Sequence, residues 1–194
     1  MTQENSRWLN PNLIELYLFS KSDQKEVINW TKDLVSQKSY ANHLVQICKN
    51  SSVRNQQYLF FVSRNTAFIK YKITSKSKKD LILNSRFVGR LFNIGMNVFK
   101  DYNRIKLELS KSNTLGLVRL PKEPSTVIIK DSLNFEITTK TTVLLPKKSR
   151  EYIISQTFTF PEYPMEEEQK LISRIDFDSI LNVRKVEKEN RLKS

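Results

Sequence analysis

The order of apolar and polar residues predicts a β-hairpin in the first half of the chain. Residues 58–64 and 67–73 are rich in aromatic and branched side chains, which favour strands. In the second run the odd-numbered positions are apolar, whereas the even-numbered positions are Phe68, Lys70 and Lys72. Because side chains alternate across a strand, one face of this hairpin is expected in the core and the lysine-bearing face at the surface.

Apolar residues recur at helical spacing in the near-neutral first fifty residues. Asp23 followed by Glu26 forms a capping pair that predicts a helix over residues 24–37. Ser39 is a suitable N-cap for a second helix over residues 40–49. This part of the chain is therefore predicted to be helical and structural.

The longest helical pattern covers residues 86–106, with Asn84 or Ser85 as its cap. Its apolar arc is wide enough for a central, largely buried helix. Pro164 and the three glutamates at 166–168 predict another helix start, because acidic side chains stabilise the positive end of a helix dipole.

Four further segments, bounded by prolines, predict strands at 115–120, 125–130, 133–145 and 150–160. In the third, one face is expected to hold Phe135, Ile137, Thr139, Thr141, Val143 and Leu145. The partial segregation of helices and strands favours an α+β fold. That fold would comprise N-terminal helices, the basic β-hairpin, a central buried helix, an antiparallel β-sheet and a C-terminal helix.

The length of 194 residues predicts one domain. Its expected parts are a helical N-terminal part over 1–50, a basic β-rich core with the central helix over 51–163, and a C-terminal helix with a polar tail over 164–194. The three glycines of the chain are too few for the glycine-rich phosphate loops of Rossmann, P-loop and kinase folds. Cys48 is the only cysteine, so no intrachain disulfide can form. We therefore expect an intracellular, reducing compartment, without a secretory signal or a transmembrane segment.

Positive charge is concentrated in the middle of the chain. The net charge is +1 over residues 1–50, +14 over residues 51–150 and −2 over residues 151–194. Such a surplus repels itself, and a polyanion is the partner that best explains it, because lysine and arginine release condensed counterions from phosphates.

Three groups of residues are candidates for contacts with nucleic acid. The first is the polar stripe of the expected central helix, spaced 4, 3, 4, 3 and 4: Arg86, Arg90, Asn93, Asn97, Lys100 and Arg104. The second is the basic hairpin and the loop after it: Arg64, Phe68, Lys70, Lys72, Lys76, Lys78 and Lys79. The stripe has the alternative of being merely the solvated side of a buried helix, and the hairpin aromatics have the alternative of being core residues.

The third group is Lys147, Lys148 and Arg150 in the sequence PKKSR at 146–150. This cluster is similar to a short basic nuclear-import sequence, so it indicates a nuclear location, but it is equally consistent with a phosphate-contacting loop or with a merely solvated turn. The glutamates at 166–168 compensate a helix dipole, with packing against the basic body as an alternative.

Catalytic signatures are poor. His43 and Cys48 are too few for a zinc site and diverge on a helix. Asp131 and Glu136 are the best carboxylates for a metal-dependent nuclease, without the clustering that such sites need. We therefore predict no enzyme activity and no cofactor.

The leading hypothesis is a non-catalytic DNA- or RNA-binding module that is a subunit of a larger assembly with protein partners. Its alternative is a protein-interaction subunit whose basic middle docks an acidic partner, and a nuclease comes last.

Overall fold

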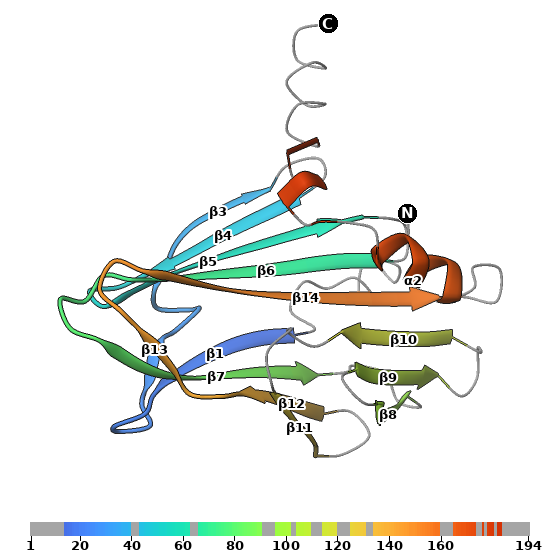
Figure 1. Ribbon diagram of the computed structural model, residues 1–194, viewed down its shortest axis with the longest axis horizontal. Helices are drawn as coiled ribbons and strands as arrows, with labels where there is room; N and C mark the ends of the chain where they lie inside the picture. The colour runs from blue at the N-terminus through green and yellow to red at the C-terminus, as the bar shows by residue number, and fades with distance from the viewer. Residues whose placement is uncertain are drawn as a thin grey trace, which may run out of the picture.

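The computed structural model describes residues 14–39, 43–62, 66–90, 96–101, 104–109, 114–119, 125–130, 134–159, 165–173, 176, 178–180 and 182–183. Within these residues, two antiparallel sheets lie one above the other as a β-sandwich (Figure 1). The sequence-based expectation of an α+β fold was therefore wrong.

The six-stranded sheet has the order β11-β12-β7-β1-β2, and β13 pairs with β7 beside β12. Its strands are β1 (Ile14–Ser20), β2 (Glu26–Ile28), β7 (Leu81–Arg90), β11 (Ser125–Ile129), β12 (Asn134–Thr139) and β13 (Thr142–Leu144). Alternation sets its two faces: in β1 the side chains of Ile14, Leu16 and Leu18 are buried, and those between them are partly exposed.

The eight-stranded sheet has the order β3-β4-β5-β6-β14-β10-β9-β8. Its strands are β3 (Leu34–Ser39), β4 (His43–Lys49), β5 (Val53–Phe61), β6 (Thr66–Ser75), β8 (Met96–Asp101), β9 (Arg104–Leu109), β10 (Thr114–Arg119) and β14 (Ser149–Thr159). The predicted hairpin is confirmed, because β5 and β6 pair in antiparallel register with Leu59 opposite Ile69.

Aromatic residues join the two sheets in the core. Phe87 of the six-stranded sheet packs edge-on against Tyr152 of the other sheet, with ring centroids 5.3 Å apart. The Tyr71 hydroxyl donates a hydrogen bond of 2.8 Å to the carbonyl oxygen of Ile14, and Ser85 bonds the Tyr152 hydroxyl at 2.9 Å. The hydroxyls of Tyr71, Ser85 and Tyr152 thus have partners across the sandwich, which offsets the cost of burying them.

Both predicted N-terminal helices are wrong. Residues 24–37 contain β2 and the start of β3, and β4 occupies residues 43–49 of the second expected helix, whose residues 40–42 lie outside the described part. Asp23 does accept a hydrogen bond from the Lys25 amide, but it closes a turn in which Gln24 adopts a φ of 56°. A side chain that caps a helix can also cap a tight turn, so the pattern did not distinguish the two.

The predicted central helix over residues 86–106 is also wrong. Residues 86–90 belong to β7, residues 96–101 form β8, and residues 104–106 belong to β9. Residues 91–95 and 102–103 lie outside the described part. Phe87 faces the core and Val88 faces outward, so apolar residues occupy both sides of β7. A wide apolar arc on a helix and a strand that is apolar on both faces give the same pattern, and the β-branched and aromatic residues favour the strand.

The predicted strand over residues 133–145 is interrupted. Phe135, Ile137 and Thr139 are buried as expected, but beyond Lys140 the buried positions become Thr142 and Leu144. Thr141, Val143 and Leu145 are therefore exposed, opposite to the prediction. Lys140 and Thr141 separate β12 from β13, so the alternation restarts out of phase.

The predicted C-terminal helix is confirmed as α2 (Met165–Ser173), which begins with the three glutamates. No helix in the described part of the chain is long and apolar enough to cross a membrane.

Candidate ligand-binding surfaces

Two chain segments that cross between the sheets meet at one end of the sandwich. The loop from β6 to β7 carries Lys76, Lys78 and Lys79, and the turn from β13 to β14 carries Lys147 and Lys148. The two segments lie side by side at the left of Figure 1. We call these five lysines and their loops the basic end.

Hydrogen bonds fix the two segments against each other. The Ser75 amide donates to the Lys148 carbonyl oxygen at 3.0 Å, and the hydroxyls of Thr74 and Ser149 lie 2.8 Å apart. Lys147 adopts a φ of 60°, which makes the turn tight. Pairing of β6 with β14 thus brings together two lysine clusters that are about seventy positions apart in the sequence.

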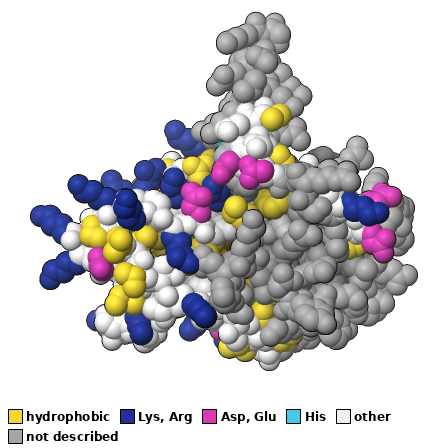
Figure 2. Space-filling model, viewed as in Figure 1, with side chains coloured by type: hydrophobic (Ala, Val, Ile, Leu, Met, Phe, Trp, Pro, Cys, Tyr) yellow, Lys and Arg dark blue, Asp and Glu magenta, His cyan; other side chains and the backbone are white. Residues whose placement is uncertain are grey.

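Further cations flank the basic end and were missed as site residues. The β4–β5 hairpin bears Lys49 opposite Arg54, and its turn accepts a hydrogen bond from the Lys76 amide to the Ser52 carbonyl oxygen at 2.8 Å. Figure 2 shows Lys and Arg side chains gathered over this side of the molecule, with few acidic ones among them. The polar Asn50-Ser51-Ser52 turn between two strand-like runs was the sequence signal for this hairpin.

The predicted stripe does not lie on one helix face, because its described residues belong to strands. Arg86 and Arg90 belong to β7, Asn97 and Lys100 to β8, and Arg104 to β9. Asn93 lies outside the described residues, as does Arg64 of the hairpin. Helical spacing has no meaning across three strands, so the stripe is no longer a unit.

The predicted face of the hairpin is covered rather than open. Phe68, expected to stack bases, is only 7% exposed, and Lys70 is 6% exposed. The C-terminal segment reaches over both neighbours of Phe68 on this face: Glu168 accepts a hydrogen bond from the Thr66 hydroxyl at 2.9 Å, and Asp178 pairs with Lys70 at 2.8 Å. The glutamate helix therefore packs against the basic body, which was the alternative interpretation of its charge.

Lys70 keeps its charge in this covered position. Burial opposes the charge most strongly, but hydrogen bonds to Asp178 and Glu151 and their negative charges together outweigh it, so the pKa of Lys70 lies above its usual value. Lys72, by contrast, is partly exposed and 3.7 Å from Glu151. Among the three predicted contact residues that the structure describes on this face of the hairpin, Phe68, Lys70 and Lys72, only Lys72 is partly exposed.

Removing the acidic anchors should loosen the C-terminal segment. In the double variant Glu168→Ala and Asp178→Ala, we expect trypsin to cleave after the exposed Lys170 about fivefold faster. The partly exposed ion pair and the hydrogen bond that are removed contribute only about 1 kcal/mol together. Mass spectrometry of timed digests measures this rate. Glu167→Ala, an exposed change on the same helix, is the control, and equal rates in both proteins would contradict the contact.

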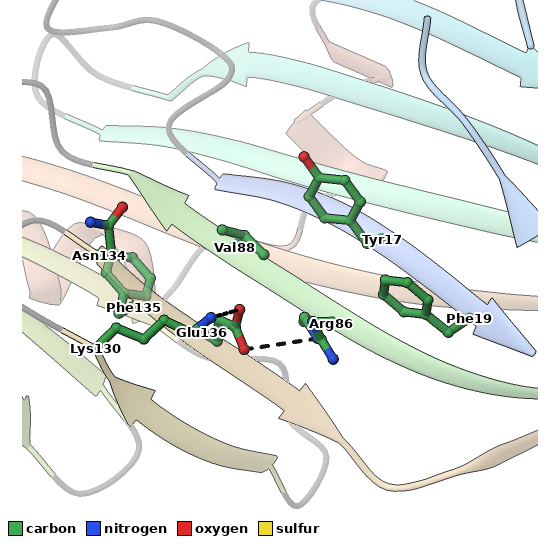
Figure 3. Close-up of a pocket in the computed structure, with 8 residues that line it drawn as sticks. All are labelled: Tyr17, Phe19, Arg86, Val88, Lys130, Asn134, Phe135 and Glu136. Atoms are coloured by element: carbon green, nitrogen blue, oxygen red, sulfur yellow. Dashed lines mark ion pairs between the residues drawn. The ribbon is translucent and has the colours of Figure 1, made fainter. Parts of the chain in front are cut away.

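A second surface lies on the outer face of the six-stranded sheet. A pocket of about 540 Å³ opens there, over β1, β7 and β12 (Figure 3). It is lined by Tyr17, Phe19, Arg86, Val88, Lys130, Asn134, Phe135 and Glu136. We call it the outer-face pocket.

The polar groups of the outer-face pocket converge on Glu136. Its carboxylate lies 2.6 Å from the Lys130 ammonium and 3.8 Å from Nε of Arg86, and the residue is 8% exposed. The Arg86 guanidinium also lies over the Phe19 ring, 4.8 Å from its centroid. Arg86 of the predicted stripe thus lines this pocket, through β7 rather than through a helix.

Catalytic groups do not cluster in the described residues. No three His, Cys, Asp or Glu side chains of the described part are close enough to hold a metal ion. His43 is partly exposed on β4, whereas Cys48 is buried, and Asp131 lies outside the described residues. Glu136 is paired with two cations and has no second carboxylate beside it among the residues that line the pocket.

No protein-family model matches the chain, and no curated protein matches it. Among solved structures, the chain is similar to a protein assigned as a kojibiose phosphorylase from the human microbiome, with a TM-score of 0.52, 10% identity, and coverage of 87% of this chain and 26% of that one. It is also similar to a heparan sulfate lyase HepC mutant from Pedobacter heparinus, with a TM-score of 0.51, 9% identity, and coverage of 81% and 26%.

A protein assigned as an aldose 1-epimerase from Escherichia coli K12 matches with a TM-score of 0.47, 8% identity, and coverage of 66% and 68%. The chain spans about a quarter of the length of the phosphorylase and of the lyase. At these identities the likeness shows the β-sandwich fold alone.

Proposed function

We propose that the protein is a non-catalytic module that binds a polyanion, in the first place a nucleic acid, through its basic end. The observation that carries this proposal is the meeting of Lys76, Lys78 and Lys79 with Lys147 and Lys148 on two hydrogen-bonded crossovers. These lysines come from two separate runs of the sequence, so chance clustering within one run does not explain their proximity.

The chemistry of the basic end favours contacts with a charged backbone. Flexible lysines bind phosphates as point charges, and each neutralised phosphate releases counterions. Phe68, the ring expected to stack on a base, is buried. We therefore expect binding that depends little on nucleotide sequence.

An anionic polysaccharide is the second candidate ligand for the same end. One of the proteins with a similar fold is a heparan sulfate lyase, and heparan sulfate presents sulfates and carboxylates along a chain. Sulfate groups satisfy the same lysines as phosphates do, so the two polymers must be compared directly.

The test is fluorescence anisotropy with labelled duplex DNA, single-stranded DNA, structured RNA and heparan sulfate, each over a salt series. We expect neutralisation of four residues (Lys78→Gln, Lys79→Gln, Lys147→Gln and Lys148→Gln) to weaken binding at least about tenfold near physiological salt and to lower the log–log salt slope by about 3. The preferred polymer identifies the ligand class.

The matched control removes four exposed lysines that lie away from the basic end: Lys38, Lys130, Lys140 and Lys170. If both variants lose the same affinity, the attraction follows net charge and not the basic end. Polyglutamate serves as a further comparison, because stronger binding to it than to any nucleic acid would favour the alternative of an acidic protein partner.

A further inference from the structure

The outer-face pocket is lined by residue types that are typical of small-molecule sites, and the proposed role of the basic end does not account for them. Its volume of about 540 Å³ lies within the range of roughly 300–1,000 Å³ that small-molecule sites occupy. It combines the rings of Tyr17 and Phe19 with a guanidinium, an ammonium, an amide and a carboxylate (Figure 3). Rings beside a few converging polar groups are typical of sites that orient a small polar molecule.

Strand register places these groups in adjoining rows on one face. Tyr17 is opposite Arg86, and Val88 is opposite Glu136. Because β1 and β12 both flank β7, Tyr17 and Glu136 are separated by two strand spacings across the sheet and two residues along it, roughly 12 Å. A disaccharide has about that length, and it would span from the ring to the carboxylate.

The charges of this pocket favour a neutral ligand. Glu136 already pairs with Lys130 and Arg86, so an anion would face the carboxylate and a cation would face the two basic groups. An apolar ligand would displace water from these charged groups without supplying hydrogen bonds in its place. A hydroxyl both donates and accepts, so a polyhydroxylated molecule can bond to the carboxylate and to the guanidinium at once.

Stability alone is a poor explanation for the Glu136 ion pairs. The side chains of the two cations are about half exposed, at 44% for Arg86 and 53% for Lys130, and ion pairs with such exposure contribute only about 0–1 kcal/mol. The ion pairs keep Arg86 and Glu136 oriented among the residues that line the pocket, and their side chains remain 44% and 11% exposed. That arrangement is the preorganisation that a polar ligand requires.

We propose that the outer-face pocket binds a neutral saccharide of one or two pyranose units. The C–H face of one ring packs on Val88 and the Tyr17 ring, and the ring hydroxyls donate to Glu136 and accept from Arg86. This site is separate from the basic end, so a test can refute sugar binding without refuting polyanion binding, and the reverse.

The test is saturation-transfer NMR on the full chain with maltose, cellobiose and lactose, at concentrations up to about 10 mM because millimolar affinities correspond to only about 4 kcal/mol. We expect saturation of the sugar C–H protons with at least one of the three. Tyr17→Leu, Glu136→Gln and Arg86→Lys should each weaken binding at least about tenfold. Arg86→Lys is the sharpest of the three, because it keeps the positive charge and removes the bidentate guanidinium donor.

Thermal unfolding of each variant establishes that it is folded, and the four-lysine variant of the basic end should bind the sugar as the wild type does. Absence of saturation transfer with all three disaccharides overturns the proposal. Sugar binding that survives all three pocket variants also overturns it, as does saturation of adenosine monophosphate in place of the sugars.

Discussion

Alanine at position 89 is expected to destabilise the fold by about 3 kcal/mol, near the upper end of what overpacking costs. Gly89 of β7 is paired with Phe135 of β12, and a Cβ atom at position 89 would overlap the Phe135 ring. Phe135 is fully buried between the sheets, so its ring has no room to retreat without displacing other core residues. Stability of ordinary domains is only about 5–15 kcal/mol, so one methyl group would remove a large part of it.

Urea denaturation measures the loss as a lower midpoint with an unchanged slope. A second background tests the cause: in Phe135→Leu, which is itself less stable, the shorter side chain gives the new methyl space. Gly89→Ala should then cost at least about 1 kcal/mol less than in the wild type, as coupling between touching residues requires. An equal cost in both backgrounds would mean that the ring contact is not the reason.

Strand patterns in the sequence were informative where one face of a strand was apolar and the other polar. The β5–β6 hairpin followed from such alternation, and Ile69, Tyr71 and Ile73 are buried as predicted. The same alternation predicted Lys70 at the open surface. In the structure the C-terminal segment covers this face, and Asp178 pairs with Lys70. Local patterns give the face of a sheet, but they do not reveal which distant segment lies on that face.

Helix predictions failed where apolar residues occupied both sides of a strand. Phe87 and Val88 fit a helical arc as well as a β-strand with two apolar faces, and the β-branched and aromatic content was the better guide. Gly89 carried a usable signal, because a glycine that is costly in a helix is often tolerated in a strand beside a large ring. Only the partner strand, with Phe135, shows why it is needed.

The two surfaces differ in how far the sequence predicted them. The lysine runs at 76–79 and 147–148 were recognised separately, but their meeting depends on the pairing of β6 with β14. The outer-face pocket was not predicted, because Tyr17, Arg86 and Glu136 come from three strands that are distant in the sequence. No local pattern links such residues until the order of the strands is known.

A steep loss of stability at alkaline pH is expected from two protonated groups in the core. Burial, with a smaller contribution from the Asp33 carboxylate, raises the pKa of Cys48 from 9.0 to about 12. Burial also raises the pKa of Tyr71 well above its ordinary value of 10.0, and the Glu15 carboxylate adds to the shift. Above these ordinary values the unfolded chain loses both protons while the folded chain keeps them, so rising pH favours unfolding.

Each group costs about 1.4 kcal/mol for every pH unit above its unfolded pKa, so the loss should reach about 4 kcal/mol at pH 11. Urea midpoints between pH 8 and pH 11 measure this loss. Cys48→Ala should remove the part that begins near pH 9, and Tyr71→Phe the part that begins near pH 10. Tyr71→Phe should also cost about 1–3 kcal/mol at neutral pH, because the carbonyl oxygen of Ile14 loses its donor.

Deprotonation of the many lysines reduces self-repulsion in all three proteins alike. The differences between their slopes of stability against pH therefore isolate the two buried groups. Identical slopes in the three proteins would show that neither group stays protonated in the folded core.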